Sequence, residues 1–208
     1  MKQSQNGKIK AVIFDLGNVL IYFDAVKAAK RFAEEANVPL ERVWAHFFIS
    51  RIEKMYTRGR ITTREFYEHS RRAFQSDIDF KKFSWLWNDI FRENRGIQPV
   101  LKRLSRRYPL YLISNTNELH FNHVRKKFPQ VFKHFRRAFP SHRLGHRKPD
   151  PRVYWKVLRT IGLKPEQTIF VDDMPKFIKA AKKVGMEGIQ FRSNRQLATD
   201  LRRLGLEL

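Results

Sequence analysis

The sequence of 208 residues contains no cysteine, few acidic residues and no long hydrophobic run. The absence of cysteine excludes disulfide bonds, cysteine-ligated zinc and cysteine nucleophiles, and it favours a reducing, cytoplasmic location. No apolar segment approaches the length that crosses a membrane, and residues 1–5 lack the apolar core of a signal peptide, so we expect no membrane partner. A hydrophobic content of 42%, with 18 Phe and 4 Trp, predicts a globular protein with a sizeable core.

The 20 acidic residues stand against 43 Lys and Arg, which gives a formal net charge of +23. Such a charge attracts anions, and these could be nucleic acid, acidic lipid or phosphorylated metabolites. The basic residues are scattered through the helical segments and form no long tail. Scattered charge is more typical of general solvation than of a dedicated nucleic-acid surface.

The segment around Asp15 organises the rest of the chain. Residues 11–14 form a short apolar run whose composition predicts a strand buried on both faces. The run stops at Asp15, and Gly17 and Asn18 follow, a pair that allows the backbone to turn sharply. Asp15 could simply cap this turn, or it could lie at the carboxyl edge of a sheet, where open α/β folds bind ligands.

Residues 22–95 contain no convincing strand. Apolar residues at helical spacing predict helices over residues 24–37, 40–52, 62–74 and 79–87. Thr62 and Glu65 match a capping box at the start of the third helix. The pattern therefore predicts a four-helix bundle inserted after the first strand, with its aromatic residues forming the bundle core.

From residue 96 onward, strands and helices alternate. Apolar runs predict strands over 110–114, 168–171 and 188–191, each separated from the next by a helical segment. This order indicates a parallel sheet with right-handed crossovers, flanked by helices. We expect an α/β protein with a Rossmann-like core of residues 1–21 and 96–208 and a helical insertion of residues 22–95.

Polar residues follow the predicted strands where each strand ends. Asp15 follows the first strand, Ser114 and Asn115 the second, and Asp172 and Asp173 the third, while Lys148 lies on a loop between the last two. Clustered carboxylates repel one another unless a cation lies among them, and an all-oxygen cluster favours Mg²⁺. A carboxylate, a hydroxyl, a lysine and magnesium are suited to phosphoryl transfer.

These segments resemble the four motifs of the haloacid dehalogenase (HAD) superfamily, and the resemblance covers almost the whole chain. Residues 14–20, 112–117, 147–151 and 170–173 are similar to motifs I to IV in that order. The helical insertion resembles the C1-type cap of the family, and the most similar subgroups are sugar-phosphatase-like members and the amino-terminal domains of some epoxide hydrolases. The resemblance implies a Rossmann-like sheet under a four-helix cap and catalysis through an aspartyl-phosphate.

The resemblance also implies roles for individual residues. Asp15 matches the nucleophile, which is also a magnesium ligand, and Gly17 occupies the position whose backbone carbonyl binds magnesium. Asp173 matches the motif IV magnesium ligand, and Asp172 is its neighbour in the metal site.

Three further residues match the phosphate-binding positions of the family. Ser114 corresponds to the phosphate-binding hydroxyl and Lys148 to the phosphate-binding lysine, both of which take part in catalysis. Asn115 lies beside Ser114 as a substrate-binding residue.

Two positions depart from the family pattern. Gly17 stands where phosphatases of the family keep a second Asp, which acts as general acid and base. Without it, a leaving group that departs easily, such as an anomeric sugar oxygen, an enol or a phenol, is favoured. Phe177 replaces an Asp or Asn that often supports the magnesium waters, which predicts weakened metal binding or slow turnover.

The sequence favours a magnesium-dependent phosphatase acting on a small phosphorylated metabolite, with a sugar 1-phosphate as one candidate substrate. One alternative is a catalytically weak HAD-like module that binds nucleic acid or an acidic partner through its basic surface. A second alternative is 2-haloacid dehalogenation, against which the paired acids Asp172 and Asp173 argue because that reaction needs no magnesium. The histidine pairs 120/123 and 142/146 have metal-binding spacing, but we expect them to be solvated or to anchor loops. The oligomeric state is open.

Overall fold

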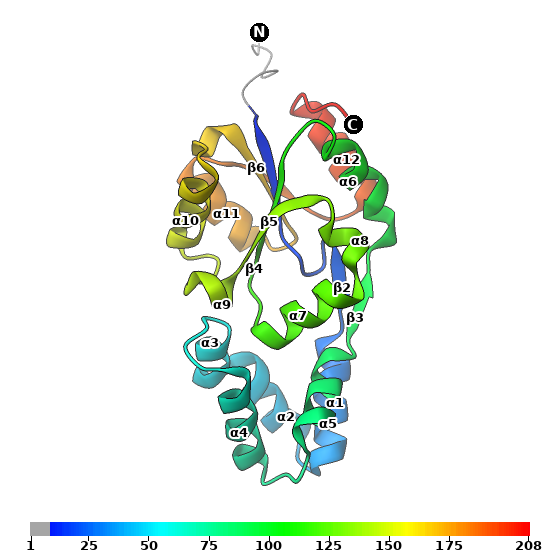
Figure 1. The fold of residues 1–208 in the computed structure, drawn as a ribbon, viewed down its shortest axis with the longest axis vertical. Helices are drawn as coiled ribbons and strands as arrows, with labels where there is room; N and C mark the ends of the chain where they lie inside the picture. The colour runs from blue at the N-terminus through cyan, green and yellow to red at the C-terminus, as the bar shows by residue number, and fades with distance from the viewer. Residues whose placement is uncertain (1–8) are drawn as a thin grey trace.

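The computed structural model describes residues 9–208, so the expectation about a signal peptide at residues 1–5 lies outside the described residues. A sheet covered by helices forms one end of the protein, and a group of helices forms the other (Figure 1). The carboxyl ends of the central strands point toward this helical group (Figure 1). In the part of the chain that is described, no helix is long and apolar enough to cross a membrane.

The main sheet is entirely parallel, with the strand order β5-β4-β1-β6-β7. Its strands are β1 (Ala11–Phe14), β4 (Leu110–Ser114), β5 (Phe135–Pro140), β6 (Thr168–Asp172) and β7 (Glu187–Gln190). The central strand β1 is fully buried, as the apolar run predicted. This sheet confirms the predicted Rossmann-like α/β fold.

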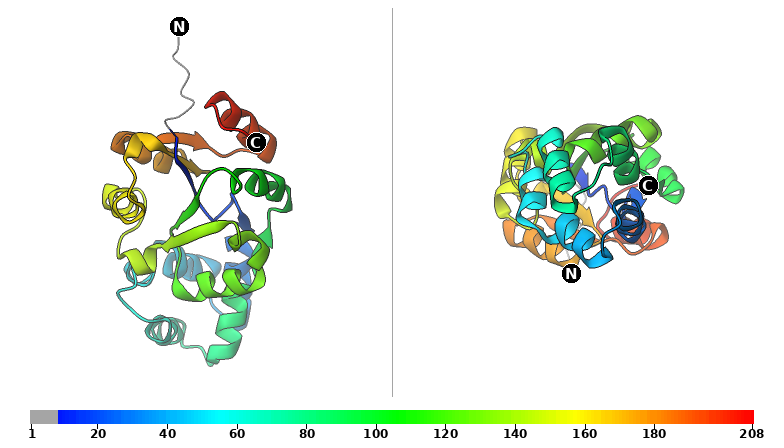
Figure 2. Two further views of the ribbon diagram at one scale, coloured as in Figure 1. Left: turned by 45° about the horizontal axis from the view of Figure 1, so that its top comes forward. Right: turned by 90° about the horizontal axis from the view of Figure 1, so that it is seen from below.

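Helices cover both faces of the sheet because successive strand side chains point to opposite sides. Val12 faces a core shared with α6 (Gln98–Leu104), α7 (Glu118–Lys127), α8 (Pro129–Phe132) and α12 (Asn194–Arg203). Ile13 faces a second core shared with α9 (Ser141–Leu144), α10 (Pro151–Ile161) and α11 (Pro175–Val184). The two further views show the same three layers (Figure 2). Short 3₁₀ turns at Arg95–Ile97 and Pro165–Gln167 precede α6 and β6.

The helical end of the protein has a separate aromatic core. Its helices are α1 (Ala25–Ala36), α2 (Leu40–Trp44), α3 (Arg51–Tyr56), α4 (Thr63–Phe74) and α5 (Phe80–Asn88). Their buried faces meet around Phe32, Phe47, Phe66 and Phe83. The predicted capping box of Thr62 and Glu65 is present at the start of α4.

The predicted single helix over residues 40–52 is wrong in one respect, because the structure divides it. A π-helical turn, Ala45–Ile49, follows α2 and ends at Ser50. Ser50 has an extended backbone, and its side chain accepts a hydrogen bond from the backbone N–H of Glu53, so it caps the new helix α3. A serine inside an apolar helical pattern gave no sign of this break.

The expectation that residues 22–95 contain no strand is also wrong. Strands β2 (Ile21–Phe23) and β3 (Phe91–Glu93) pair antiparallel and form a two-stranded ribbon at the base of the helical group (Figure 1). Each strand has three residues, which is too short for an alternating pattern to be recognised. The ribbon holds the two ends of the helical group side by side.

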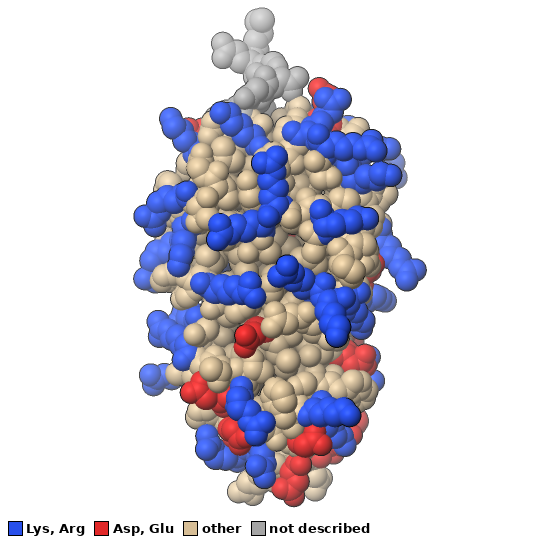
Figure 3. Space-filling model, viewed as in Figure 1, with Lys and Arg blue, Asp and Glu red and all other residues tan. Residues whose placement is uncertain are grey.

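Charge is distributed unevenly over the face in Figure 3. Lys and Arg side chains cover the sheet-containing end, whereas the acidic side chains visible on this face gather mainly at the helical end (Figure 3). The high net charge is therefore spread over a wide surface of the core.

Candidate active site

The polar residues at the strand ends come together as predicted. Asp15 directly follows β1, Ser114 ends β4 and Asp172 ends β6, and β1 lies between the other two strands. Because parallel strands present their carboxyl ends at one edge, the three side chains reach the same edge of the sheet. This edge faces the helical group (Figure 1).

Lys148 joins two carboxylates at this edge. Its Nζ lies 2.8 Å from Asp15 Oδ1 and 2.6 Å from Asp172 Oδ2, and it also donates to the Ile113 carbonyl at 3.4 Å. Only 3% of Lys148 and none of Asp172 is exposed. A buried ammonium is stable only when it is paired, so these contacts fix its position.

Burial and charge shift the pKa values of these three groups. Burial raises the pKa of Asp15, although Lys148 opposes the shift. Burial likewise raises the pKa of Asp172 to about 7, with Lys148 again opposing and Asp15 adding to the shift. Burial on its own would lower the pKa of Lys148, but attraction from Asp15 and Asp172 outweighs it and raises the pKa. The lysine therefore stays charged between two carboxylates.

The donor set of the cluster fits a magnesium ion. Oxygens of Asp15, Asp172 and Asp173 all lie within 4.8 Å of one another, and this is the one such cluster among residues 9–208. Both oxygens of Asp172 are engaged, because Oδ2 contacts Lys148 and Oδ1 accepts a bond from the N–H of Met174 at 2.8 Å. Asp15 and Asp173 are thus better placed than Asp172 to bind a cation directly.

The turn after β1 supports the same site. The N–H of Ile21 donates to the Leu16 carbonyl and that of Asn18 to the Ile21 carbonyl, and Asn18 has a φ of 53°. Among the described residues, no hydrogen bond reaches the Gly17 carbonyl. That oxygen is available for the metal-binding role that the sequence predicts.

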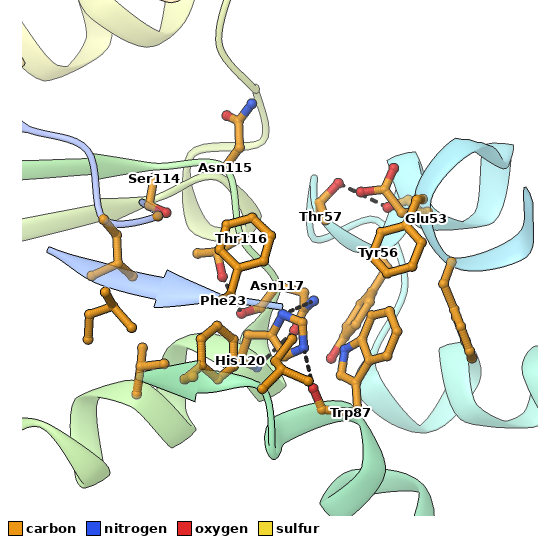
Figure 4. Close-up of a pocket in the computed structure, with 18 of the residues that line it drawn as sticks. Phe23, Glu53, Tyr56, Thr57, Trp87, Ser114, Asn115, Thr116, Asn117 and His120 are labelled. Atoms are coloured by element: carbon orange, nitrogen blue, oxygen red, sulfur yellow. Dashed lines mark hydrogen bonds between the residues drawn. The ribbon is translucent and has the colours of Figure 1, made fainter. Parts of the chain in front are cut away.

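Ser114 and Asn115 have different surroundings. Ser114 is buried and lines a cavity next to Leu16 and Gly17 (Figure 4). The side chain of Asn115 accepts from the N–H of Lys148 at 2.8 Å and donates to the Lys148 carbonyl at 2.9 Å. Asn115 therefore clamps the backbone of the lysine, a function that the sequence analysis missed, while its predicted substrate contact stays a prediction.

Phe177 does more than remove a polar side chain from the site, because its ring contacts Lys148. Its ring centroid lies 4.9 Å from Lys148 Nζ, and the Phe170 ring lies 5.3 Å from the same atom. Aromatic faces attract cations at this distance. Phe177 thus packs against the lysine ammonium together with Phe170.

A cavity of about 250 Å³ extends from Ser114 into the helical group (Figure 4). Residues at the sheet edge line one side of the cavity, and the wall within the helical group is mostly aromatic. The aromatic wall residues are Phe47, Phe48, Tyr56, Phe66, Trp87 and Phe91.

Polar contacts hold the helical group against the core beside this cavity. Arg147 Nη1 donates to both carboxylate oxygens of Glu53, at 3.0 and 2.8 Å, and to Thr57 Oγ1 at 2.7 Å. Ser141 Oγ donates to the Thr57 carbonyl at 2.6 Å. Sequence reasoning missed this contact, because Glu53 and Arg147 are far apart in the chain and Glu53 lies outside the four motifs.

Two of the histidines, His120 and His142, bond to backbone carbonyls of other segments, whereas Nε2 of His123 has no partner among residues 9–208. His120 Nε2 donates to the Trp87 carbonyl at 2.9 Å, and Asn117 Nδ2 lies 3.3 Å from His120 Nδ1. Burial lowers the pKa of His120 to about 3, so the ring is neutral. His142 Nδ1 donates to the Thr116 carbonyl at 3.2 Å. His146 lies 3.6 Å from Asp150, an acidic neighbour that the sequence analysis did not foresee.

Comparisons with known proteins agree with this geometry. The chain is 25% identical over 193 residues to a D-ribitol-5-phosphate phosphatase of Bacteroides thetaiotaomicron, which covers 88% of this chain and 91% of that protein. It is 24% identical to a sesquiterpene phosphatase of Aspergillus oryzae, over 94% of this chain and 96% of that protein. Neither is named for a nucleic-acid function, so the nucleic-acid alternative gains no support from them.

A solved structure shares both the fold and the sequence likeness. It is a HAD family enzyme of Bacteroides thetaiotaomicron in complex with magnesium and inorganic phosphate, with a TM-score of 0.82 and 27% identity, covering 88% of this chain and 94% of that one. A model of the haloacid dehalogenase-like hydrolase family matches residues 9–185. With this match spanning most of its length, the chain belongs to the haloacid dehalogenase-like hydrolase family.

Proposed function

We propose that this protein is a magnesium-dependent phosphatase that hydrolyses a small phosphorylated metabolite through an aspartyl-phosphate on Asp15. The observation that carries the proposal is the buried arrangement of Asp15, Lys148 and Asp172, with Asp173 beside it, next to a cavity that Gly17 and Ser114 line. We also propose that residues 22–95 act as the cap that encloses the substrate over a core of residues 1–21 and 96–208.

Asp15 is the nucleophile in this proposal. A carboxylate oxygen of Asp15 attacks the phosphorus atom, and the bond between phosphorus and the leaving oxygen breaks as that oxygen takes the electron pair. Water then attacks the phosphorus of the aspartyl-phosphate, which releases inorganic phosphate and restores the carboxylate.

Lys148 and Ser114 position the phosphoryl group. The ammonium of Lys148 lies 2.8 Å from Asp15 and stabilises the negative charge of the phosphoryl oxygens. The Ser114 hydroxyl donates a hydrogen bond to one of these oxygens. Asp172 and Asn115 act through Lys148, because they hold its ammonium and its backbone.

The donor set of Asp15, Asp173 and the Gly17 carbonyl would hold Mg²⁺, which when bound supplies positive charge to the phosphoryl oxygens. The residues of the chain bind and orient the ester, and Asp15 supplies the nucleophile. The magnesium complex of the similar Bacteroides enzyme supports this assignment.

The proposal is tested by phosphate release from a panel of phosphorylated metabolites and acetyl phosphate, with Mg²⁺ and with a chelator. We expect turnover that requires Mg²⁺ and is abolished by Asp15→Asn. The matched control is Asp77→Asn, since Asp77 is exposed on the helical group. Turnover of Asp15→Asn equal to that of Asp77→Asn would refute the proposal.

A further inference from the structure

We propose that the cavity receives the leaving group of an aryl phosphate: a flat, apolar body of one to two rings that carries a hydrogen-bond acceptor. The inference rests on the proposed phosphatase function and names the substrate class of that site. Four observations support it, namely the aromatic wall, the engagement of several polar lining residues, the indole N–H of Trp87, and the apolar surroundings of Gly17.

The aromatic wall is rigid and buried. The ring centroids of Phe47 and Trp87 are 4.4 Å apart, and those of Tyr56 and Phe66 are also 4.4 Å apart and nearly parallel. All four residues are at most 3% exposed. An apolar cavity of about 150 Å³ holds benzene, so a cavity of about 250 Å³ has room for a larger, fused ring.

Several of the polar groups that line the cavity already have partners within the protein. Arg147 engages Glu53 and Thr57. The hydroxyl of Tyr56 contacts Thr63 Oγ1 at 2.9 Å and accepts from the N–H of Leu119 at 3.2 Å. A polyol would have to leave several hydroxyls unpaired against this wall, and each carries a free-energy penalty. An aromatic leaving group avoids this penalty.

One polar atom of the lining has no partner among the described residues. The indole Nε1 of Trp87 is buried and makes no hydrogen bond. Figure 4 shows Trp87 at the cavity wall near Tyr56 and His120. A buried N–H without a partner is costly, and an acceptor on the bound leaving group would satisfy it.

The surroundings of Gly17 favour the same leaving group. A Cβ atom on Gly17 would lie 3.0 Å from Cε1 of Phe23, so an aromatic ring stands where a side chain at this position would begin. No acid is therefore available there to protonate a departing alkoxide. A phenol such as that of tyrosine has a pKa of about 10, far below the value of about 15.7 for water, and its anion leaves without prior protonation.

The first experiment measures kcat/KM with Mg²⁺ for acetyl phosphate, phenyl phosphate, 2-naphthyl phosphate and ribitol 5-phosphate. We expect 2-naphthyl phosphate to exceed phenyl phosphate by about tenfold, mainly through KM, because the second ring buries more apolar area. Ribitol 5-phosphate should be the poorest substrate. Asp15→Asn supplies the background rate.

These outcomes separate the inference from the proposed function. If acetyl phosphate is not hydrolysed above the background, both the phosphatase function and the inference fall. If acetyl phosphate is hydrolysed but 2-naphthyl phosphate gains nothing over phenyl phosphate, or ribitol 5-phosphate is preferred, the inference alone is overturned.

The second experiment tests the indole N–H with Trp87→Phe. The ratio of kcat/KM for 4-methylumbelliferyl phosphate, which has a ring carbonyl, to that for 2-naphthyl phosphate, which has none, should fall about tenfold in the variant. An unchanged ratio in a variant that retains the wild-type circular dichroism spectrum would contradict the role of Trp87. If the variant does not fold, the comparison of phenyl and naphthyl esters in the wild type still decides the inference.

Discussion

Lys148 and Asp172 form an ion pair that is almost completely buried, with 2.6 Å between Nζ and Oδ2. Asp15 contacts the same ammonium, so one positive charge balances two carboxylates at the end of the sheet. We therefore expect Lys148 to contribute to folding as well as to the proposed activity.

We expect Lys148→Met to abolish turnover and to lower the free energy of unfolding by about 3–5 kcal/mol, because it leaves two buried carboxylates without a partner. Urea denaturation provides the measurement. The matched control is Lys183→Met, which removes an exposed lysine. The double variant Lys148→Met/Asp172→Asn should recover part of the lost stability, and a double variant less stable than Lys148→Met would argue against the pairing.

The contact between Arg147 and Glu53 should couple the helical group to the core. Both side chains are largely buried, with 25% and 12% exposed, and two hydrogen bonds join them. A double-mutant cycle with Arg147→Met and Glu53→Gln should give a coupling energy in unfolding of about 1–3 kcal/mol.

The exposed pair Arg64–Glu68 is the control for this cycle. Its side chains are 67% and 33% exposed, so its coupling energy should be below about 0.5 kcal/mol. Equal coupling in the two pairs would show that Arg147 does not hold the helical group in place.

His46 should make the protein less stable in acid. Burial lowers its pKa to about 4, and His69 adds to the shift. Between pH 4 and 6.5 the unfolded chain binds a proton at this histidine that the folded chain does not, so stability falls as the pH drops through this range. His46→Gln should reduce the slope of unfolding free energy against pH in this window. A slope identical to that of the wild type would mean that His46 is protonated in the folded protein.

Much of the fold was predictable because its signals are local. The strand before Asp15 and the helix that begins with the capping box of Thr62 and Glu65 both carry short-range patterns, and the structure has them at those positions. The ribbon of β2 and β3 was missed because its strands are too short for periodicity and pair across the whole helical group.

The site residues that lie in the motifs could be predicted from the sequence. The contacts between segments that are far apart in the chain could not. Asp15, Lys148 and Asp172 follow from strand ends and motif spacing. The clamp of Asn115 on Lys148, and an indole N–H of Trp87 without a partner in residues 9–208, arise only once distant segments pack together. A sequence pattern records residue types, whereas these functions depend on which atoms meet.

The most direct test of the central claim is detection of a phosphoryl group on Asp15. The protein would be mixed with acetyl phosphate and Mg²⁺, quenched in acid and digested, and the peptide containing Asp15 would be analysed by mass spectrometry. We predict a phosphoryl adduct on Asp15 that is absent from Asp15→Asn and from samples with a chelator. Hydrolysis of acetyl phosphate at the wild-type rate by Asp15→Asn, or an adduct that forms only on another residue, would contradict the account.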